Sequence, residues 1–392
     1  MPPVRQLLCY LAAGSLALVA PVSTAANRTV LPPADAGPAN APVALLVDLS
    51  SGQTLYAHEA QRRFIPASIT KVMTAFLAFE LIEEGRLSPR QVFVVDEYTG
   101  SEWGGVGSTM FLETGDRVQV DDLISGITSV SANDGSVALA IGAMGSVDAW
   151  VNSMNAKARE LGLRDSHFGT PNGWMDEGRT YVSARDLVTL AKAMITRHPA
   201  LYRHYFGREG FAYNGIAQDN HDPLSGSFEG ADGIKTGYTR QAGFGYLGSA
   251  VRNGRRLALV VAAAPSGPVR NRASRALMEW GFANFAVRPL YRKGEVVGRA
   301  RVQGGAAPTV PLVPADDLSL SLPRGAQHGQ LGLAIRYLGP LPAPIRKGDE
   351  VAELVVSLPG GNQHAMTLIA GEDVAPAGFF SRIRNGLAGL AG

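Results

Sequence analysis

Cysteine is almost absent from this chain: the only one among its 392 residues is Cys9. Cys9 lies in a segment that we expect to be removed, which leaves a mature protein without a thiol. This absence excludes cysteine nucleophiles, zinc–cysteine sites and iron–sulfur clusters, and no disulfide can stabilise the fold. The seven histidines show no His-Glu-x-x-His or similar ligand spacing, so we expect neither a metal nor another cofactor.

Charge is also scarce, since charged residues make up 18% of the chain and the formal net charge is +2. Removing Arg5 with the leader lowers that charge to +1, which gives no electrostatic basis for nucleic-acid binding. Apolar residues make up 46%, with 46 glycines and 24 prolines, a composition typical of a globular protein with many turns. The length predicts two domains, each with its own core.

The first residues carry a secretion pattern. One cation, Arg5, precedes an uncharged apolar stretch from Leu7 to Ala20, and small residues follow up to Ala25. This pattern predicts a signal peptide over residues 1–25. A retained membrane anchor is the alternative, but the apolar stretch is shorter than the ~20 residues that a membrane-spanning helix needs. Residues 26–40 are rich in alanine and proline and read as a linker.

Residues 41–288 combine strand and helix patterns. Two apolar runs flank Ser51-Gly52 and two more flank Asn253-Gly254, which predicts two hairpins. Apolar periodicity predicts helices over Ser68–Glu84, Val120–Met144, Ser146–Leu161, Ser183–Thr196 and Val269–Phe285. The pattern indicates an α+β layer fold whose sheet pairs early and late segments.

Residues 289–376 show short alternating apolar runs separated by glycine and proline, which predicts a small all-β sandwich or barrel domain. In the tail, residues 377–392, one helical face would carry Phe379, Phe380, Ile383, Leu387 and Leu390. That face could lie in a membrane interface. A helix docked on its own domain, or a frayed end, remains an equal alternative because the glycines of this segment weaken the helix.

The stretch "IPASITKVM", Ile65 to Met73, places Ser68 one helical turn before Lys71. Their side chains can therefore meet on one face, and Ser68 would sit where free N–H groups favour developing negative charge. Lys71 can act as a base only when neutral, which requires its pKa to fall by about three units from 10.4. Burial could supply part of this shift, and a second cation nearby could supply more.

Lys235-Thr236-Gly237 could supply that second cation. We expect an edge strand here that offers N–H groups, a hydroxyl and an ammonium to a substrate carboxylate, with Gly237 leaving room for the substrate backbone. Ser131-Ala132-Asn133, at the start of an apolar helix, could relay a proton through Ser131 and hold a substrate amide through Asn133. Taken singly, Ser68 could instead be a helix cap, and both lysines ordinary surface residues.

The order Ser-x-x-Lys, Ser-x-Asn, Lys-Thr-Gly resembles the motif set of the low-molecular-mass penicillin-binding proteins that act as D-alanyl-D-alanine carboxypeptidases. The resemblance runs from about Ala41 to the C-terminus and includes "GSTMFLETGD", "SHFGTPNGW" and "DGIKTGYTRQAGF". It implies a penicillin-binding, β-lactamase-like transpeptidase domain, an antiparallel sheet with helices, followed by the β-sandwich domain.

The resemblance also implies roles for individual residues. Ser68 would attack the bond between the last two D-alanines of a peptidoglycan stem peptide and form an acyl-enzyme. Lys71 would take its proton, and Ser131 would pass a proton to the departing D-alanine. The terminal carboxylate would be bound by Lys235, Thr236 and Arg270, and the oxyanion hole would be the N–H groups of Ser68 and Tyr238. β-Lactams would acylate Ser68. The protein would be periplasmic, and it would be attached peripherally to the inner membrane if its C-terminal tail binds that membrane.

Three alternatives remain at this stage. A β-lactamase shares the motifs, but no glutamate lies in an obvious Glu-x-x-Leu-Asn setting and an extra β domain is unexpected. A D,D-endopeptidase that cuts peptidoglycan crosslinks is closer in chemistry. A non-catalytic peptidoglycan-binding scaffold is disfavoured by the intact motifs.

Two residues depart from the family pattern: Ala132 stands where relatives often have glycine, and Trp174 where a smaller apolar residue is common. We expect both to reshape the rim of the cleft.

Overall fold

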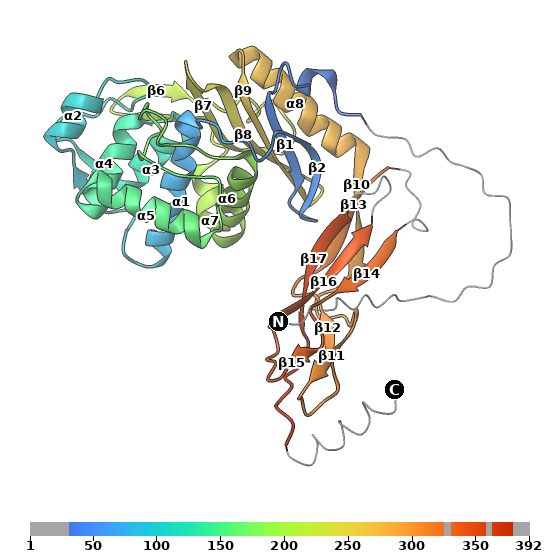
Figure 1. Ribbon diagram of the computed structural model, residues 1–392. Helices are drawn as coiled ribbons and strands as arrows, with labels where there is room; N and C mark the ends of the chain where they lie inside the picture. Colours follow the sequence, from blue (N-terminus) through green and yellow to red (C-terminus); the bar gives the residue numbers. More distant parts are fainter. Residues whose placement is uncertain (1–30, 325–330, 358–362, 379–392) are drawn as a thin grey trace. The chain divides into compact units, whose positions relative to one another are not determined.

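The structure, a computed structural model, describes residues 31–324, 331–357 and 363–378 (Figure 1). The predicted signal peptide and almost all of the predicted tail, from residue 379, lie outside the described residues. The chain divides into two compact units between Asn284 and Phe285, slightly before the division at residue 288 that the sequence predicted. Each unit has its own apolar core.

The first unit is built on a five-stranded antiparallel sheet with the order β2-β1-β9-β8-β7. The strands are β1 (Val43–Asp48), β2 (Gln53–His58), β7 (Ala231–Thr239), β8 (Gly243–Arg252) and β9 (Arg255–Ala264). Both predicted hairpins are confirmed, and the β8–β9 turn uses Asn253 and Gly254 at positive φ, as a tight hairpin requires. Because β1 pairs with β9, the sheet joins early and late segments as expected.

Helices cover both faces of this sheet. Figure 1 shows α8 (Gly267–Asn284) on one side and the larger helical group on the other. That group contains α1 (Lys71–Glu83), α2 (Glu97–Trp103), α3 (Val120–Ser129), α4 (Asn133–Met144), α5 (Val147–Glu160), α6 (Ala184–Arg197) and α7 (Pro199–Tyr205). Two short hairpins complete the unit: β3 (Val92–Val94) with β4 (Arg117–Gln119), and β5 (Gly210–Tyr213) with β6 (Ile216–Asp219).

Part of the predicted linker 26–40 packs on the first unit. The 3₁₀ helix η1 (Ala34–Ala36) contacts α8, and Ala36 is buried. The indole N–H of Trp280 donates to the carbonyl of Leu31 at 2.7 Å. From residue 31 onward the segment is therefore part of the folded unit, because its backbone and small side chains are held by α8.

Helix α1 is buried on nearly all sides, as its apolar sequence predicts, and residues from Val72 to Leu81 form the centre of the core. A helix packed all round has little freedom to move, so it is a rigid support for the residues at its start. Directly before it, the 3₁₀ helix η2 (Ala67–Thr70) carries Ser68. Ser68 is thus part of a tight turn leading into α1, and it is not the N-cap of that helix.

The predicted single helix Val120–Met144 is wrong, because it is two helices, α3 and α4. Ser131 adopts φ +65°, which breaks the helical backbone. The N–H of Asn133 then donates to the carbonyl of Ser108 at 2.8 Å instead of to a helical carbonyl. The break places the Ser-x-Asn motif in the short connection where α4 begins.

The second unit is all β, and the sandwich prediction is confirmed. β10 (Phe285–Tyr291) pairs with β13 (Leu318–Pro323), and a six-stranded sheet has the order β14-β16-β17-β12-β11-β15. Leu320 and Leu322 from the small sheet share one core with Leu312, Leu354 and Leu368 from the large one. The large sheet consists of β11 (Gly298–Gln303), β12 (Thr309–Val313), β14 (Gly332–Arg336), β15 (Leu341–Pro342), β16 (Glu350–Ser357) and β17 (Gln363–Ala370).

Within the described ranges, no single helix has both the length and the apolar character needed to cross a bilayer. Only α4 and α5 taken together, bent by 90°, meet that test by length and composition.

Candidate active site

The predicted motifs meet where the edge strand β7 packs against the turn η2. Among the described residues β7 pairs only with β8 in the sheet, so it is an edge strand, as predicted for the Lys-Thr-Gly segment. Gly237 also has a structural role. A Cβ at this position would lie 2.3 Å from the carbonyl oxygen of Pro66, so glycine is needed for the strand to approach the turn that carries Ser68. The predicted role, room for the substrate backbone, stays a prediction.

Ser68 and Lys71 are in hydrogen-bond contact, with 3.0 Å between Ser68 Oγ and Lys71 Nζ. Two further oxygens hold the lysine amine: Asn133 Oδ1 at 2.8 Å and the carbonyl of Asn172 at 2.7 Å. Lys71 is 1% exposed, whereas Ser68 is partly accessible. The amine is therefore fixed in place, and the hydroxyl next to it can be reached from outside.

The pKa of Lys71 lies well below its ordinary value of 10.5. Burial is the main cause, the nearby charge of Lys235 adds to it, and the carboxylate of Asp134 opposes it. The sequence argument required burial and a second cation, and both are present. Lys71 can therefore be neutral at a pH where ordinary lysines are charged.

The Ser-x-Asn motif lies on the other side of the same site. Ser131 and Asn133 both line the cavity in front of Ser68. Both polar atoms of the Asn133 side chain form hydrogen bonds: Oδ1 accepts from Lys71, and Nδ2 donates to the carbonyl of Val106 at 2.9 Å. It therefore positions the lysine, and only the second hydrogen of Nδ2 is left for a substrate amide.

Lys235 is 3% exposed, and its ammonium lies 3.2 Å from the carbonyl of Thr236. Burial lowers its pKa to about 7; the carboxylate of Asp222 raises the value and Arg270 lowers it. Asp222 is held by the hydroxyl of Tyr246, 3.0 Å from each carboxylate oxygen. The site thus contains two buried lysines, and the pKa of each lies below its ordinary value.

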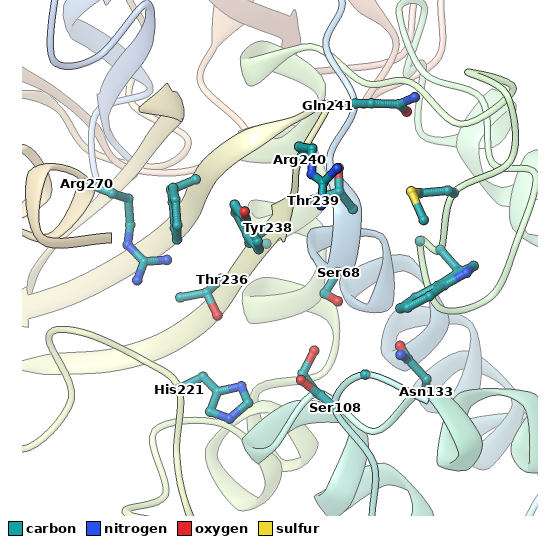
Figure 2. Close-up of a pocket in the computed structure, with 17 residues that line it drawn as sticks. Ser68, Ser108, Asn133, His221, Thr236, Tyr238, Thr239, Arg240, Gln241 and Arg270 are labelled. Carbon is teal, nitrogen blue, oxygen red and sulfur yellow. The ribbon is translucent and has the colours of Figure 1, made fainter. Parts of the chain in front are cut away.

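In front of these groups lies a cavity of about 830 Å³ (Figure 2). Its wall includes Thr236, Gly237 and Tyr238 from β7, and Arg270 from α8. Arg270 is oriented by donation to the carbonyl of Gly245 at 3.1 Å and to Asn271 at 2.7 Å. Tyr238 is 55% exposed and stacks on Phe244 with 4.1 Å between ring centroids. The cavity brings together the predicted groups at its surface, with the two lysines behind them.

Of the two departures noted in the sequence, only Trp174 lines the cavity. Its ring packs against Gly107 and meets Trp103 edge to face at 5.8 Å. Ala132 is fully buried beneath the site, with its methyl group close to Gly126 and Gly135. The expectation that Ala132 reshapes the rim is therefore wrong, because its side chain points into the core.

Three residues of the site were not identified from the sequence. Asn172 contributes a backbone carbonyl, which no residue pattern reveals, although its segment "SHFGTPNGW" carried part of the resemblance. His221 lines the cavity, and its pKa is lowered to about 4 by partial burial and by the charges of Lys235, Lys71 and Arg270. It is therefore uncharged at neutral pH.

Asp134, the third, lies at the start of α4 and organises the loop between α2 and β4. Its buried carboxylate accepts from the N–H groups of Met110 and Leu112 at 3.1 and 3.0 Å and from the hydroxyl of Thr109. The acidic residue directly after Asn133 in the sequence was the available signal. Within the described part of the chain, no group of three or more histidine, cysteine or acidic residues is arranged to hold a metal ion.

Comparison with known families gives two matches. The family Peptidase S11, described as D-alanyl-D-alanine carboxypeptidase, matches residues 29–266, and the C-terminal domain of penicillin-binding protein 5 matches residues 285–376. The chain is 34% identical over 391 residues to the D-alanyl-D-alanine carboxypeptidase DacC of Escherichia coli, covering 98% of this chain and 96% of that relative.

Solved structures are similar as well. Penicillin-binding protein 5 of Haemophilus influenzae matches with a TM-score of 0.76 at 31% identity, over 86% of this chain and 98% of that one. Penicillin-binding protein D2 of Listeria monocytogenes, solved in an ampicillin-bound form, matches with a TM-score of 0.54 at 27% identity. That match covers 97% of the Listeria chain but 62% of this one.

Proposed function

The chain belongs to the Peptidase S11 family and is a serine-type D-alanyl-D-alanine carboxypeptidase, and on this premise we propose how its residues perform the reaction. Ser68 is the nucleophile and Lys71 its general base. One observation carries this assignment: the amine of Lys71 contacts two carbonyl oxygens and one hydroxyl. A neutral amine has two N–H donors and one lone pair. With both hydrogens on Asn133 and Asn172, the lone pair faces the hydroxyl of Ser68.

The reaction then proceeds in two halves. The hydroxyl proton passes to Lys71 as Ser68 Oγ bonds to the carbonyl carbon that joins the two D-alanines. The tetrahedral intermediate collapses, the C–N bond breaks, and the D-alanine amine leaves with a proton delivered through Ser131. Water, deprotonated at the same base, then attacks the ester and releases the shortened peptide and free Ser68.

Negative charge that develops on the carbonyl oxygen needs donors that are already oriented. We assign this role to the N–H groups of Ser68 and Tyr238. Ser68 lies in the first turn before α1, where N–H groups lack helical acceptors. Tyr238 follows the glycine that brings β7 against that turn. The contact between strand and turn thus sets the spacing of the oxyanion hole.

Capture of the terminal carboxylate falls to Lys235, Thr236 and Arg270. Thr236 and Arg270 line the cavity, and Lys235 lies buried behind them. A carboxylate placed there fixes the C-terminal residue, so that the bond before it faces Ser68. The free C-terminus of a stem pentapeptide supplies a carboxylate of this kind.

The proposed substrate is the pentapeptide stem of peptidoglycan, and β-lactams are proposed to acylate Ser68 as mimics of it. We further propose that the predicted leader, residues 1–25, exports the protein to the periplasm and that the tail, residues 377–392, attaches it to the inner membrane. Fractionation of cells that express the full chain, or a version ending at Pro376, tests attachment. Equal recovery of both forms in the soluble fraction argues against a membrane role for the tail.

Purified protein incubated with a fluorescent penicillin and with a stem pentapeptide tests the mechanism. We expect covalent label on Ser68 and release of one D-alanine per peptide. Lys71→Ala should lower the acylation rate about 10²- to 10⁴-fold and leave the circular dichroism spectrum unchanged, whereas Lys192→Ala, an exposed lysine of α6, should acylate normally. Equal acylation by wild type and Lys71→Ala would remove Lys71 from the role of base.

A further inference from the structure

The charges that line the catalytic cavity all have one sign. Arg270 and Arg240 belong to its wall, and none of the residues that form the wall is a carboxylate. Arg270 lies near Thr236, whereas Arg240 lies next to Thr239 and Gln241, beyond Tyr238 (Figure 2). The cavity wall therefore carries a cation on either side of Tyr238, and the proposed mechanism uses only the one beside Thr236.

The two arginines are held differently. Arg270 donates hydrogen bonds to Gly245 and Asn271. Arg240 is exposed in the β7–β8 turn, and within the described residues its guanidinium has neither a hydrogen-bond nor an ion-pair partner. An unpaired guanidinium at the mouth of a cavity can form paired hydrogen bonds with a carboxylate of a ligand.

The direction of β7 indicates which part of a peptide would reach Arg240. A substrate that lies along this free edge places its terminal carboxylate at Thr236 and runs back past Tyr238. Thr236 and Arg240 are four residues apart, or about 13 Å in extended backbone. Two residues of an extended substrate span about 7 Å, so the side chain of the residue before D-alanyl-D-alanine covers the remaining distance.

Apolar residues of the same cavity suit the stem of such a side chain. Trp174 and Met175 also line the cavity, and Met175 is 55% exposed. Apolar surface of this kind can bury methylene groups while the charged end stays at the exposed rim. The favoured side chain is therefore aliphatic along its length and carboxylate at its end.

We propose that Arg240 is a specificity-determining residue, which binds a carboxylate at the end of the side chain that precedes D-alanyl-D-alanine. The inference rests on the proposed mechanism, because that mechanism fixes which way the substrate lies. The proposed role of Arg240 adds a preference for one class of peptide side chain, which the three motifs do not determine.

A matched pair of peptides tests it: acetyl-X-D-alanyl-D-alanine with X either L-2-aminopimelate or its side-chain amide, which has the same shape without the charge. We measure D-alanine release and take the ratio of kcat/KM for the acid to that for the amide. Wild type should favour the acid about 5-fold, a size typical of one exposed charge-assisted contact. The ratio should fall towards one at high salt, which screens exposed charges.

Variants at one position separate charge from shape. The ratio should be near one in Arg240→Gln, below one in Arg240→Glu and above one in Arg240→Lys. Arg203→Gln, a change at an exposed arginine of α7 outside the cavity wall, should keep the wild-type ratio. A ratio that stays at 5 in Arg240→Gln, or is one in wild type, overturns the role of Arg240 while D-alanine release still supports the mechanism. No release from either peptide overturns both.

Discussion

Two buried lysines share this site, and different neighbours shift their pKa values. Lys71 is enclosed by Asn133, Asn172 and Ser68, and burial together with Lys235 lowers its pKa. Lys235 has the carboxylate of Asp222 nearby, which limits the fall of its own pKa to about 7. Separate pKa values allow one amine to act as a base while the other pairs with a carboxylate.

This difference predicts the pH dependence of substrate capture. Lys235 loses its proton as the pH rises through about 7, and a neutral amine no longer attracts a carboxylate. We expect kcat/KM for a peptide with a free C-terminus to fall above pH 7, because this parameter reports the free enzyme. A pH profile of D-alanine release measures the fall.

The control is the same profile in Lys235→Ala. The variant should be slower overall and should lack the decline above pH 7. Loss of activity on the acid side should remain, because protonation of Lys71 removes the base. An unchanged alkaline decline in Lys235→Ala would assign that decline to another group.

At the level of elements, the site depends on how closely strand β7 meets the turn η2. Gly237 permits this approach, since a Cβ there would lie 2.3 Å from the carbonyl oxygen of Pro66 and 3.2 Å from the N atom of Ile69. Helix α1 cannot yield, because it is packed on all sides. Any bulk at this position must therefore move the strand, and with it Tyr238 and Thr236.

Gly237→Ala should lower the rate of penicillin acylation about 10²-fold, because a shift of about 1 Å in a reacting group has an effect of this size. Gly105→Ala is the matched control, since a Cβ there meets nothing within 4 Å, and it should acylate at the wild-type rate. Labelling time courses with the fluorescent penicillin compare the two. A normal rate in Gly237→Ala would mean that the strand and turn can separate without harm.

The loop between α2 and β4 depends on Asp134. Its buried carboxylate accepts from the backbone of Met110 and Leu112 and from Thr109, and an asparagine would direct an NH₂ group at some of these donors. We expect Asp134→Asn to lower the free energy of unfolding by about 2–4 kcal/mol, the range for a buried hydrogen-bonded charge. Thermal unfolding measures the change.

Asp148→Asn, an exposed residue of α5, should leave the melting temperature unchanged. Asp134 also raises the pKa of Lys71, so its loss should move the acid limb of the activity profile to lower pH. A melting temperature equal to wild type in Asp134→Asn would show that the loop is held by other contacts.

At the scale of the whole molecule, the two units differ in their contribution to catalysis. All proposed catalytic and binding residues lie in residues 31–284, which have their own core. The match to the Listeria protein bound to ampicillin covers 62% of this chain and 97% of the Listeria chain. The Listeria chain therefore binds a β-lactam although its match leaves more than a third of this chain uncovered.

A truncated protein that ends at Asn284 should therefore still be labelled by the fluorescent penicillin, within about threefold of the full chain; domains with separate cores can fold alone. Gel fluorescence at matched concentrations, with circular dichroism to confirm folding, is the measurement. A folded but unlabelled truncation would show that the second unit is needed for acylation.

The sequence by itself determined the three motifs, their order, the buried helix after Ser68, both hairpins and the all-β second unit. These features are local: they follow from residue type, spacing and apolar period along a short stretch. A break at Ser131 was not visible inside a continuous apolar pattern, so one helix was predicted where there are two.

Only the tertiary structure decided what surrounds the reacting groups. The carbonyl of Asn172 reaches Lys71 across 101 residues of sequence, and every residue has a carbonyl, so no pattern distinguishes it. For the same reason Gly237 faces Pro66, Ala132 points into the core, and Arg240 has no partner among the described residues. Contacts between distant segments depend on how rigid elements pack against one another. The sequence around each residue does not show which distant residue it will contact.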